Sequence, residues 1–460
     1  MKQYCYMRIA AIIVSCVVLP LAPVCGDDKS DSNLDRDLKR VLGNLGFTGR
    51  VEQTLETRLG RAVDPELADL GRNLFFDKIL SLHGDNACAG CHAPSRGFGD
   101  TQSIAIGIDN NNIVGSDRSG PRNQRRTPMV LNTAFFPNLM WNSRFASMAG
   151  DPFDNSFGFV FPPPEGLTLS NQPHLLNAQA FIPPTERIEM AGFDFPGGNH
   201  EIRVEVIRRL NESAAYHSRF RSVFSDLGED DISYDMLAAA LAEFQISLTL
   251  VDAPIDRFAR GQSKAMSKDL KKGALLFFGK ANCVSCHSVS GHSNEMFSDF
   301  ATHVLAVPQI SPVLTNAAFD GPGHNEDFGL EQVTGNPQDR YKFRSSPLRN
   351  VGLQPTFFHN GAFTKLEDAI QHHLDVAKSV REYRPSRHVA SDLAGPTGPM
   401  APVLAKLDAK LQKPTKLSHN EFRQLVAFVR FGLLDERSLF LDSLIPVELI
   451  SGLEPLEFQD

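Results

Sequence analysis

The chain has 460 residues, which is long enough for two or three domains that each bury a core. Hydrophobic residues make up 42% of the chain and charged residues 22%, a balance typical of globular proteins that excludes disordered and fibrous classes. The formal net charge is −8 and no long basic run is present, so we also exclude a nucleic-acid-binding protein.

The first 25 residues have the pattern of an export signal. Lys2 and Arg8 supply positive charge, and the apolar stretch at residues 9–21 is too short to span a bilayer comfortably. Two kinds of processing stay open, plain cleavage or lipidation at Cys25, although the Pro-Val pair before Cys25 suits a lipoprotein site poorly. We therefore expect an exported, periplasmic protein with residues 1–25 as its signal peptide.

Two predicted helices each lead into a Cys-x-x-Cys-His sequence. The first begins with Asp64 as N-cap and Pro65 at the first helical position, and the second begins with the N-cap Ser267. Apolar residues recur at helical spacing behind both starts. The helices lead to CAGCH at residues 88–92 and to CVSCH at residues 283–287, a separation too long for a solenoid. We interpret the two segments as duplicated domains.

The spacing within each motif is that of c-type haem attachment. Two thiols on one helical turn reach the two vinyl groups of one porphyrin, and the next residue places an imidazole beneath the iron. A four-thiolate zinc site would leave both histidines unexplained, and a disulfide or thioredoxin-like pair needs no following histidine. The sequence therefore predicts two covalently bound haem c groups. The residues expected to hold them are Cys88, Cys91, His92, Cys283, Cys286 and His287.

Further helices are predicted between and after the motifs. Apolar residues at helical spacing indicate helices at residues 204–210 and 236–250, and another is expected at residues 366–374. The final helix begins behind Ser418 with a capping box, in which the N-cap and the third helical residue bind each other's backbone N–H groups. Residues 253–261 resemble a linker between the two halves of the chain.

Strands are expected to be scarce, because alternating runs such as residues 103–108 are short. The predicted fold class is mainly α, with two c-type cytochrome domains that have long loops and are related by internal duplication. We place the N-terminal domain at residues 31–262 and the C-terminal domain at residues 263–440. The tail at residues 441–460 has no assigned role.

The segments around both motifs resemble the bacterial di-haem cytochrome c peroxidases and their MauG-type relatives. The likeness runs from about Leu67 to about Phe431. The stretches that carry it include LFFD (74–77), GPRN (120–123), LRNV (348–351) and FHNG (358–361). The resemblance implies a cytochrome-c peroxidase-like oxidoreductase, in which the N-terminal haem reacts with hydrogen peroxide and the C-terminal haem passes electrons to it.

The family's distal pocket has the pattern Q-A-x-x-P-x-x-x-x-x-E-M, which residues 179–190 match. The resemblance implies that Glu189 is the acid–base group, that Gln179 orients the peroxide and that Pro183 walls the pocket. The chemistry needs such a group in any case, because breaking the O–O bond requires a proton to leave one oxygen and reach the other. The alternative makes Glu189 a solvated loop carboxylate beside Arg187.

Many family members cap the peroxide-binding iron with a histidine sixteen residues past the motif histidine. Here that position is Ile108, so the resemblance implies an open sixth position opposite His92. A rearranged loop that brings His174 or His200 to the iron is the alternative.

The second haem's sixth ligand in this family lies fourteen residues past the histidine of the FHNG-type sequence. A methionine or a tyrosine is usual there, whereas this chain has His373. The resemblance thus implies bis-histidine ligation, which favours ferric iron and lowers the reduction potential. In the alternative, His372 and His373 are surface residues and Met296 or Met400 is the ligand.

Two further sites follow from the resemblance. Trp141 lies in MWNSR, similar to the family's Phe-Trp-Asp-Gly-Arg, which implies electron relay between the haems rather than simple core packing. The family also holds a calcium ion between its domains, and Asn132, Gln354 and Thr356 occupy the corresponding positions. An insertion at residues 151–177 is expected to narrow peroxide access or to bind a partner.

Three functions stay open. The first is a peroxidase that draws electrons from a small donor protein, cytochrome c or similar. The second is a MauG-like oxidase that modifies Trp or Tyr of a protein substrate, and the third is a non-enzymatic di-haem electron carrier. Gln179 and Glu189 argue against the carrier, which needs no acid–base pair. We expect peroxidase chemistry and leave a homodimer open.

Overall fold

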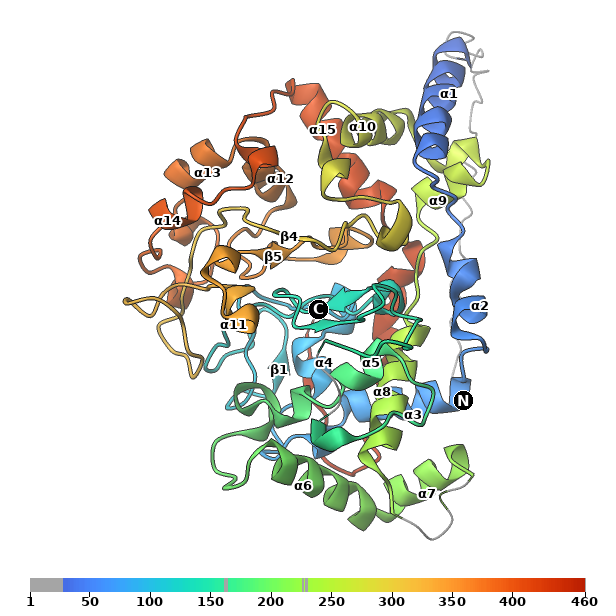
Figure 1. Cartoon of the computed structure of the whole chain (residues 1–460), viewed down its shortest axis with the longest axis vertical. Coiled ribbons are helices and arrows are strands. Elements are labelled where there is room, and N and C mark those ends of the chain that lie inside the picture. The colour runs from blue at the N-terminus through green and yellow to red at the C-terminus, as the bar shows by residue number, and fades with distance from the viewer. Residues whose placement is uncertain (1–27, 161–163, 226, 228–230, 460) are drawn as a thin grey trace, which may run out of the picture.

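The computed structural model describes residues 28–459 apart from 161–163, 226 and 228–230. The predicted signal peptide and Cys25 lie outside the described residues. Helices account for 45% of the chain and strands for 6%, so the mainly α prediction is confirmed. Figure 1 shows two lobes along the long axis, one around α3 (Pro65–Phe76) and α8 (Tyr234–Ser247) and the other around α10 (Lys268–Phe278) and α15 (His419–Ala427).

The α-helices follow one another along the chain with long irregular connections. They are α1 (Asp28–Asn44), α2 (Leu55–Leu59), α3 (Pro65–Phe76), α4 (Cys88–Cys91), α5 (Leu175–Gln179), α6 (Asn199–Glu212), α7 (Ala214–Val223), α8 (Tyr234–Ser247), α9 (Pro254–Ala259), α10 (Lys268–Phe278), α11 (Glu331–Thr334), α12 (Leu366–Leu374), α13 (Val376–Glu382), α14 (Ala401–Leu404) and α15 (His419–Ala427).

The strands form three two-stranded sheets. β1 (Ile113–Val114) pairs in parallel with β6 (Glu457–Phe458), with Ile113 opposite Glu457. The antiparallel pairs are β2 (Asn138–Leu139) with β3 (Phe145–Ala146), and β4 (Thr302–His303) with β5 (Phe343–Arg344). Residues 103–108 contain no strand, and only an isolated bridge joins Ile106 to Arg122.

The predicted N-caps start the two motif-bearing helices and the last one. The Asp64 carboxylate accepts the backbone N–H groups of Glu66 and Leu67 at the start of α3. Ser267 caps α10 in the same manner, and Ser418 forms the predicted capping box at α15. The helix predicted at residues 366–374 is α12, with those bounds.

Each lobe is built on a close crossing of two helices at a glycine. A Cβ atom at Gly71 in α3 would lie 1.8 Å from the carbonyl oxygen of Ala240 in α8. A Cβ atom at Gly273 in α10 would lie 2.0 Å from the carbonyl oxygen of Gln424 in α15. Both crossings therefore require a residue without a side chain, and each brings the phenylalanine pair that follows the glycine into a buried core.

The segment at residues 253–261 is not the predicted linker. It contains α9, and Asp256 within that helix forms a fully buried, two-bonded ion pair with Arg349 at 2.7 and 2.8 Å. Pro254 at the first helical position starts the helix, because its fixed φ suits that position. The apolar residues of α9 bury Ile255 and Phe258 in the core of the second lobe.

The two ends of the described chain each cross to the other lobe. Leu38 and Leu42 of α1 pack in the core of the second lobe, although residues 31–262 were expected to form the first domain. The tail at residues 441–460 runs back onto the first lobe, where Ser451 donates two hydrogen bonds to the buried Asp77 carboxylate. Phe458 packs against Phe76.

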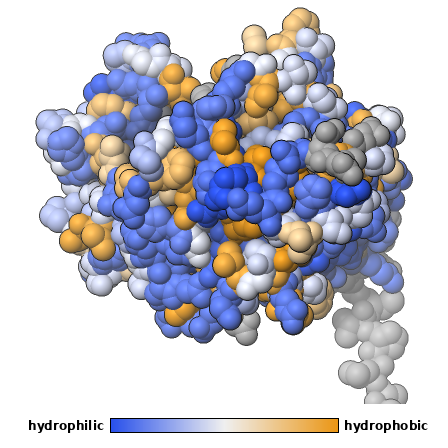
Figure 2. Space-filling model, turned by 90° about the horizontal axis from the view of Figure 1, so that it is seen from below, coloured by the Kyte–Doolittle hydropathy of each residue, from blue (hydrophilic) through white to orange (hydrophobic). Residues whose placement is uncertain are grey.

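The described part of the chain contains no helix that is both long and apolar enough to cross a membrane. Figure 2 shows the face at the end of the molecule that carries α6 and α7. Polar residues cover most of that face, and the apolar residues lie among them in separate groups.

Candidate haem and peroxide site

The histidine of each Cys-x-x-Cys-His motif is held in one orientation by its own Nδ1 atom. His92 donates from Nδ1 to the carbonyl oxygen of Phe98 at 2.9 Å, and His287 donates to the carbonyl oxygen of Phe297 at 3.0 Å. Burial lowers the pKa of both imidazoles to about 4, so they are neutral. In both, Nε2 is left with its lone pair, which is the arrangement of a histidine that ligates a metal.

The two cysteine pairs line different cavities. Cys88 and Cys91 border a first cavity of about 570 Å³, and Cys283 and Cys286 border a second cavity of about 220 Å³. All four are free thiols. Because the pairs face separate spaces, they cannot share one zinc ion, and the four-thiolate alternative is excluded.

The first cavity brings together all four residues expected to act in catalysis. Gln179, Pro183 and Glu189 line it together with Trp141, and His92 lines it as well. Gln179 is the last residue of α5, and Pro183 begins the short turn that follows. The matched pattern therefore folds into the wall of the space beside the first motif.

Glu189 lies on a single π-helical turn, Arg187–Ala191. The carbonyl oxygen of Glu186 accepts the backbone N–H groups of Glu189, Met190 and Ala191, which holds the turn closed. Such turns occur frequently at functional sites. Burial, and next the Glu186 carboxylate, raises the pKa of Glu189 to about 8.

The charged neighbours of Glu189 differ from those of a solvated loop carboxylate. The Arg187 guanidinium points away and donates to the backbone carbonyls of Gly192, Phe195 and Gly197. The Glu186 carboxylate instead lines the cavity and pairs with Arg144 at 2.8 Å. Neither Glu186 nor Arg144 was assigned a role from the sequence, because the pair forms only when two distant loops meet.

No second histidine lines the first cavity among the described residues. Ile108 is buried. Both ring nitrogens of His174 are engaged, Nδ1 by the N–H of Leu176 and Nε2 by the carbonyl oxygen of Ala134. His200 lies beside Glu165 and is largely exposed. In the described structure, neither His174 nor His200 is therefore placed to reach the iron after a rearrangement of the loop.

In the second cavity, the imidazole of His373 faces that of His287. Their ring centres are 6.2 Å apart. Two imidazoles that ligate one ion through nitrogens at about 2 Å have their ring centres roughly 6 Å apart. His373 donates from Nδ1 to the carbonyl oxygen of Ala369 at 2.8 Å, which leaves Nε2 with its lone pair. This geometry fits an iron ion between the two rings.

The alternative ligands do not fit the second cavity. His372 uses both ring nitrogens, with Ser379 Oγ and the carbonyl oxygen of Leu305 each at 2.9 Å. Met296 and Met400 pack in other clusters and do not line this cavity.

Three buried polar groups fit the acidic side groups of haem. Arg126 and Arg344 line both cavities, and burial lowers the pKa of each to about 10. Neither forms an ion pair with a carboxylate in the described structure. The Nε2 atom of His359, which lines the second cavity, is buried without a hydrogen-bond partner. Anionic propionates would satisfy all three groups, a signal that the sequence pattern does not contain.

Trp141 lies between the two cavities. It lines both of them, and its indole Nε1 donates to the carbonyl oxygen of Arg126 at 2.8 Å. Its exposed fraction is 6%, so burial alone is also compatible with core packing.

At the expected calcium site, the family pattern uses the side chain of an asparagine, here Asn132, and the backbone carbonyl oxygens at the positions of Gln354 and Thr356. The side-chain oxygen of Asn132 accepts the N–H of Leu250 at 2.7 Å, and the Thr356 hydroxyl donates to the carbonyl oxygen of Gln102 at 2.9 Å. The Gln354 amide contacts Arg126. The calcium site stays a prediction. Asn123, by contrast, has a buried side-chain oxygen without a partner, an acceptor of the kind that a cation fills.

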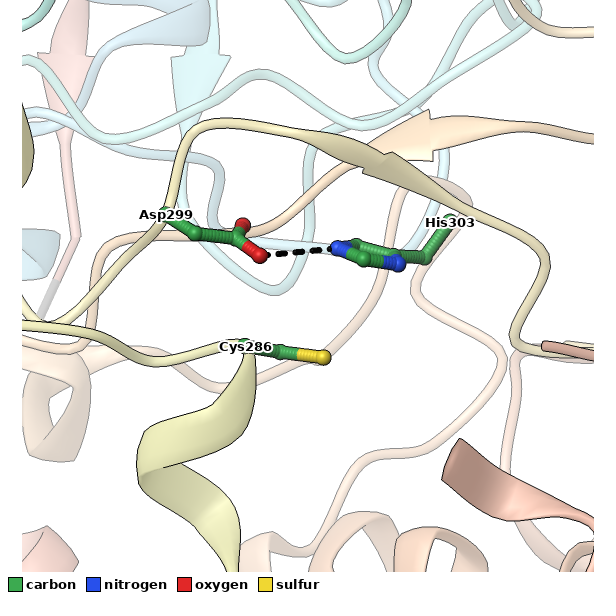
Figure 3. Close-up of side chains that lie close together, drawn as sticks. All are labelled: Cys286, Asp299 and His303. Atoms are coloured by element: carbon green, nitrogen blue, oxygen red, sulfur yellow. Dashed lines mark hydrogen bonds and ion pairs between the residues drawn. The ribbon is translucent and has the colours of Figure 1, made fainter. Parts of the chain in front are cut away.

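A second grouping of metal-ligand types occurs beside the second motif. Cys286, Asp299 and His303 lie close together, with the sulfur of Cys286 directed toward the imidazole (Figure 3). His303 bonds Asp299 through Nε2 at 3.0 Å and Asp408 through Nδ1 at 2.6 Å. Hydrogen bonding to Asp299, and also to Cys286 and Asp408, raises the pKa of His303 to about 10. An imidazolium has no lone pair, so we read this cluster as an ion-pair network.

The insertion at residues 151–177 contacts the first cavity only marginally. Of its described residues, Leu176 alone lines that cavity. Phe153 packs against Phe135 and His174, and the Arg58 guanidinium lies over its ring at 4.1 Å. The insertion is thus held on the protein body rather than across the cavity.

Comparison with known proteins gives a consistent result. Residues 65–264 match the family model described as di-haem cytochrome c peroxidase. Methylamine utilization protein MauG of Methylorubrum extorquens is 29% identical, over 79% of this chain and 77% of that protein. Cytochrome c551 peroxidase of Pseudomonas aeruginosa is 28% identical, over 69% of this chain and 74% of that protein. A crystal structure of a MauG-like protein associated with microbial copper homeostasis has the same fold, with a TM-score of 0.58 and 23% identity over 84% of this chain and 93% of the other.

Proposed function

We propose that the chain is a periplasmic peroxidase of the di-haem cytochrome c peroxidase and MauG family of oxidoreductases, and that it reduces hydrogen peroxide to water. Electrons pass in this proposal from the C-terminal to the N-terminal haem, with a small protein such as a cytochrome c as donor. The observation that carries it is the position of Glu189, which meets Gln179 and Pro183 beside the His92 motif.

Both haems are proposed to be covalently attached c-type groups. When bound, they supply the redox chemistry and, on the His92 side, the position at which peroxide reacts. Cys88 and Cys91 attach the first, and Cys283 and Cys286 attach the second. His287 and His373 would hold the iron of the second, which is supported by the 6.2 Å between their ring centres.

The chain's own residues handle the protons. Glu189, in its ionised form, accepts a proton from one oxygen of the peroxide and returns it to the other oxygen. The Gln179 amide orients the peroxide by hydrogen bonding, and the ring of Pro183 closes one side of the space. Trp141 is the proposed path for electrons, supported by its place between the two cavities.

The two proposed domains follow each other in the predicted order. However, α1 packs in the second lobe, and the C-terminal tail packs on the first lobe. The N-terminal, peroxidatic domain covers residues 31–262 and the C-terminal, electron-transfer domain residues 263–440. Descent from one duplicated domain is supported by the matching glycine crossings at Gly71 and Gly273. A calcium ion between the domains remains part of the proposal, without support from the Asn132 contacts.

A second candidate is a MauG-like oxidase that modifies Trp or Tyr of a partner protein. The bis-histidine geometry of the second cavity favours it, because such ligation lowers the potential and disfavours a reduced resting haem. The two candidates share the peroxide site and differ in what supplies the electrons.

The test of the peroxide site is Glu189→Gln. General acid–base groups contribute about 10²–10⁴-fold, so the variant should react with peroxide more slowly by roughly that factor. Mass spectrometry should show both haems still attached, since attachment depends on the cysteine pairs. The exposed Glu454→Gln is the matched control. Near-normal peroxide reduction by Glu189→Gln would remove Glu189 from the proton path, and loss of a haem would give it a structural role instead.

A further inference from the structure

A lysine-rich turn lies at the mouth of the second cavity. Lys410 and Lys413 line that cavity from residues 404–416. The Lys410 ammonium donates to the carbonyl oxygen of Ser285 at 2.8 Å and lies 3.5 Å from Cys286 Sγ. A positive charge therefore rests directly on the second Cys-x-x-Cys-His motif, between that motif and solvent.

The ion-pair network around His303 holds this turn in place. The N–H of Asp408 donates to the carbonyl oxygen of Val304 at 3.1 Å, and its carboxylate binds His303 Nδ1 at 2.6 Å. The other carboxylate oxygen of Asp408 caps the turn by accepting the N–H of Lys410 at 2.9 Å. His303 is bound in turn to Asp299 (Figure 3). These bonds therefore hold the part of the turn at Asp408 and Lys410 against the second motif.

The charge of the turn is opposite to that of the whole chain. It carries Lys406, Lys410, Lys413 and Lys416 against one carboxylate, Asp408, which shares the His303 cation with Asp299. Lys413 and Lys416 are exposed, and neither forms an ion pair in the described part of the chain. The nearby Lys280, by contrast, is neutralised by Glu421 at 2.7 Å. Against a net charge of −8, this is a local positive surface.

We propose that the lysine turn, residues 404–416, is the docking surface for an acidic electron-carrier protein. The proposal rests on the proposed peroxidase function and names the class of donor. Two reduced carriers each lose one electron, and these two electrons with two protons convert one hydrogen peroxide into two waters. Carrier contacts of this kind are small and short-lived, so charge complementarity largely decides which carrier docks. A basic carrier would be repelled.

The test compares charge reversal on the turn with the same change elsewhere. The variant is Lys413→Glu with Lys416→Glu, which leaves Lys410 and its motif contact intact. The matched control is Lys39→Glu with Lys264→Glu, which reverses two exposed lysines, one in α1 and one just after α9. The probes are a reduced acidic monohaem cytochrome c, a reduced basic cytochrome c, and a small neutral reductant that needs no docking.

Electrostatic steering changes association rates by 10–10³-fold, so kcat/KM for the acidic cytochrome should fall at least about tenfold at low ionic strength. The loss should shrink as salt is added, because surface charges are screened. Calorimetric titration with the oxidised acidic cytochrome should show weaker binding by a similar factor. The basic cytochrome should be oxidised faster by the double variant, and Lys39→Glu with Lys264→Glu should behave as the wild type with all probes.

The outcomes separate the two proposals. If the wild type reduces peroxide with the small reductant but the double variant binds and oxidises the acidic cytochrome as the wild type does, the docking surface is wrong and the peroxidase function stands. If the wild type reduces no peroxide with any donor, the peroxidase function is wrong, and calorimetry still decides docking. Preferential binding of the basic cytochrome by the wild type would also overturn the docking proposal.

Discussion

At the scale of single residues, the chemistry depends on how Glu189 is held and charged. The Glu186 carboxylate raises the pKa of Glu189, whereas the Arg144 guanidinium lowers it. The thiols of Cys88 and Cys91 also interact electrostatically with Glu189, and they would lose their protons on the proposed haem attachment. Burial is the largest cause of the raised pKa of Glu189, and these two opposing charges adjust the pH at which Glu189 can accept a proton.

The pH dependence of the reaction with peroxide should report this arrangement. Because the ionised form of Glu189 is the proton acceptor, the bimolecular rate should rise as the pH rises through about 8. Glu186→Gln removes a negative charge, so the midpoint should move to lower pH. Arg144→Gln removes a positive charge and should move the midpoint to higher pH. Stopped-flow rates across the pH range measure both.

The control for that profile is Glu189→Gln, which should remove the rise altogether. A purely structural role for the Glu186–Arg144 pair would slow both variants without opposite displacements of the midpoint. That outcome would contradict electrostatic control of Glu189.

His373 gives a second prediction at this scale. His373→Ala removes one of the two facing imidazoles, so the second haem should change from low-spin to high-spin or water-ligated in the resting ferric protein. Electron paramagnetic resonance and absorption spectra measure the change. His419→Ala, an exposed histidine in α15, should leave the spectra unaltered. A low-spin signal that survives His373→Ala would show that another residue is the ligand.

Much of the residue-level site is predictable from the sequence, because haem attachment and the distal pattern are local motifs. Cys88 and His92 were predicted from spacing, whereas Glu189 was predicted from the resemblance to the family's distal pattern. The partners Arg126, Arg344 and Glu186 cannot, because each is brought to a cavity by segments far apart in the chain. His373 was predicted from its position in the family pattern, and the hydrogen bonds support that choice, because both ring nitrogens of His372 are already bonded.

At the scale of elements, the two motif-bearing helices were predictable from caps and apolar spacing, whereas α9 was not. Its Ala-Pro start was interpreted as a linker, and the buried Asp256–Arg349 pair that fixes it joins residues far apart in sequence. A buried Asp256 carboxylate without the Arg349 guanidinium would strongly destabilise the folded protein, so this ion pair fixes α9 in the core.

The glycine crossings give a prediction about stability. Gly71→Ala places a methyl group against the backbone of α8, so it should lower the free energy of unfolding by about 1–3 kcal/mol. Gly43→Ala is the matched control, because no atom lies within 4 Å of the added carbon near the end of α1. There, alanine should raise the free energy of unfolding by about 0.5–1 kcal/mol. Denaturant unfolding measures both, and equal effects would contradict the close crossing of α3 and α8.

At the scale of the whole molecule, each end of the described chain packs on the lobe formed by the other half of the chain. α1 packs in the second lobe, and the tail with Ser451 and Phe458 packs on the first. Neither contact has a local sequence signal. The sequence could therefore predict each domain only as one uninterrupted stretch of the chain. The consequence is that the two cavities and Trp141 between them are held by segments from both halves of the chain.

The central claim is tested most directly by stopped-flow mixing of the resting diferric protein with hydrogen peroxide, alone and with a reduced acidic cytochrome c. Since no histidine but His92 lines the first cavity in the described residues, the protein should react with peroxide without prior reduction. With the cytochrome present, two molecules of cytochrome should be oxidised for each peroxide, over many turnovers. A protein that consumes peroxide but leaves the reduced cytochrome untouched, and oxidises Trp or Tyr of a partner protein instead, would contradict the peroxidase account.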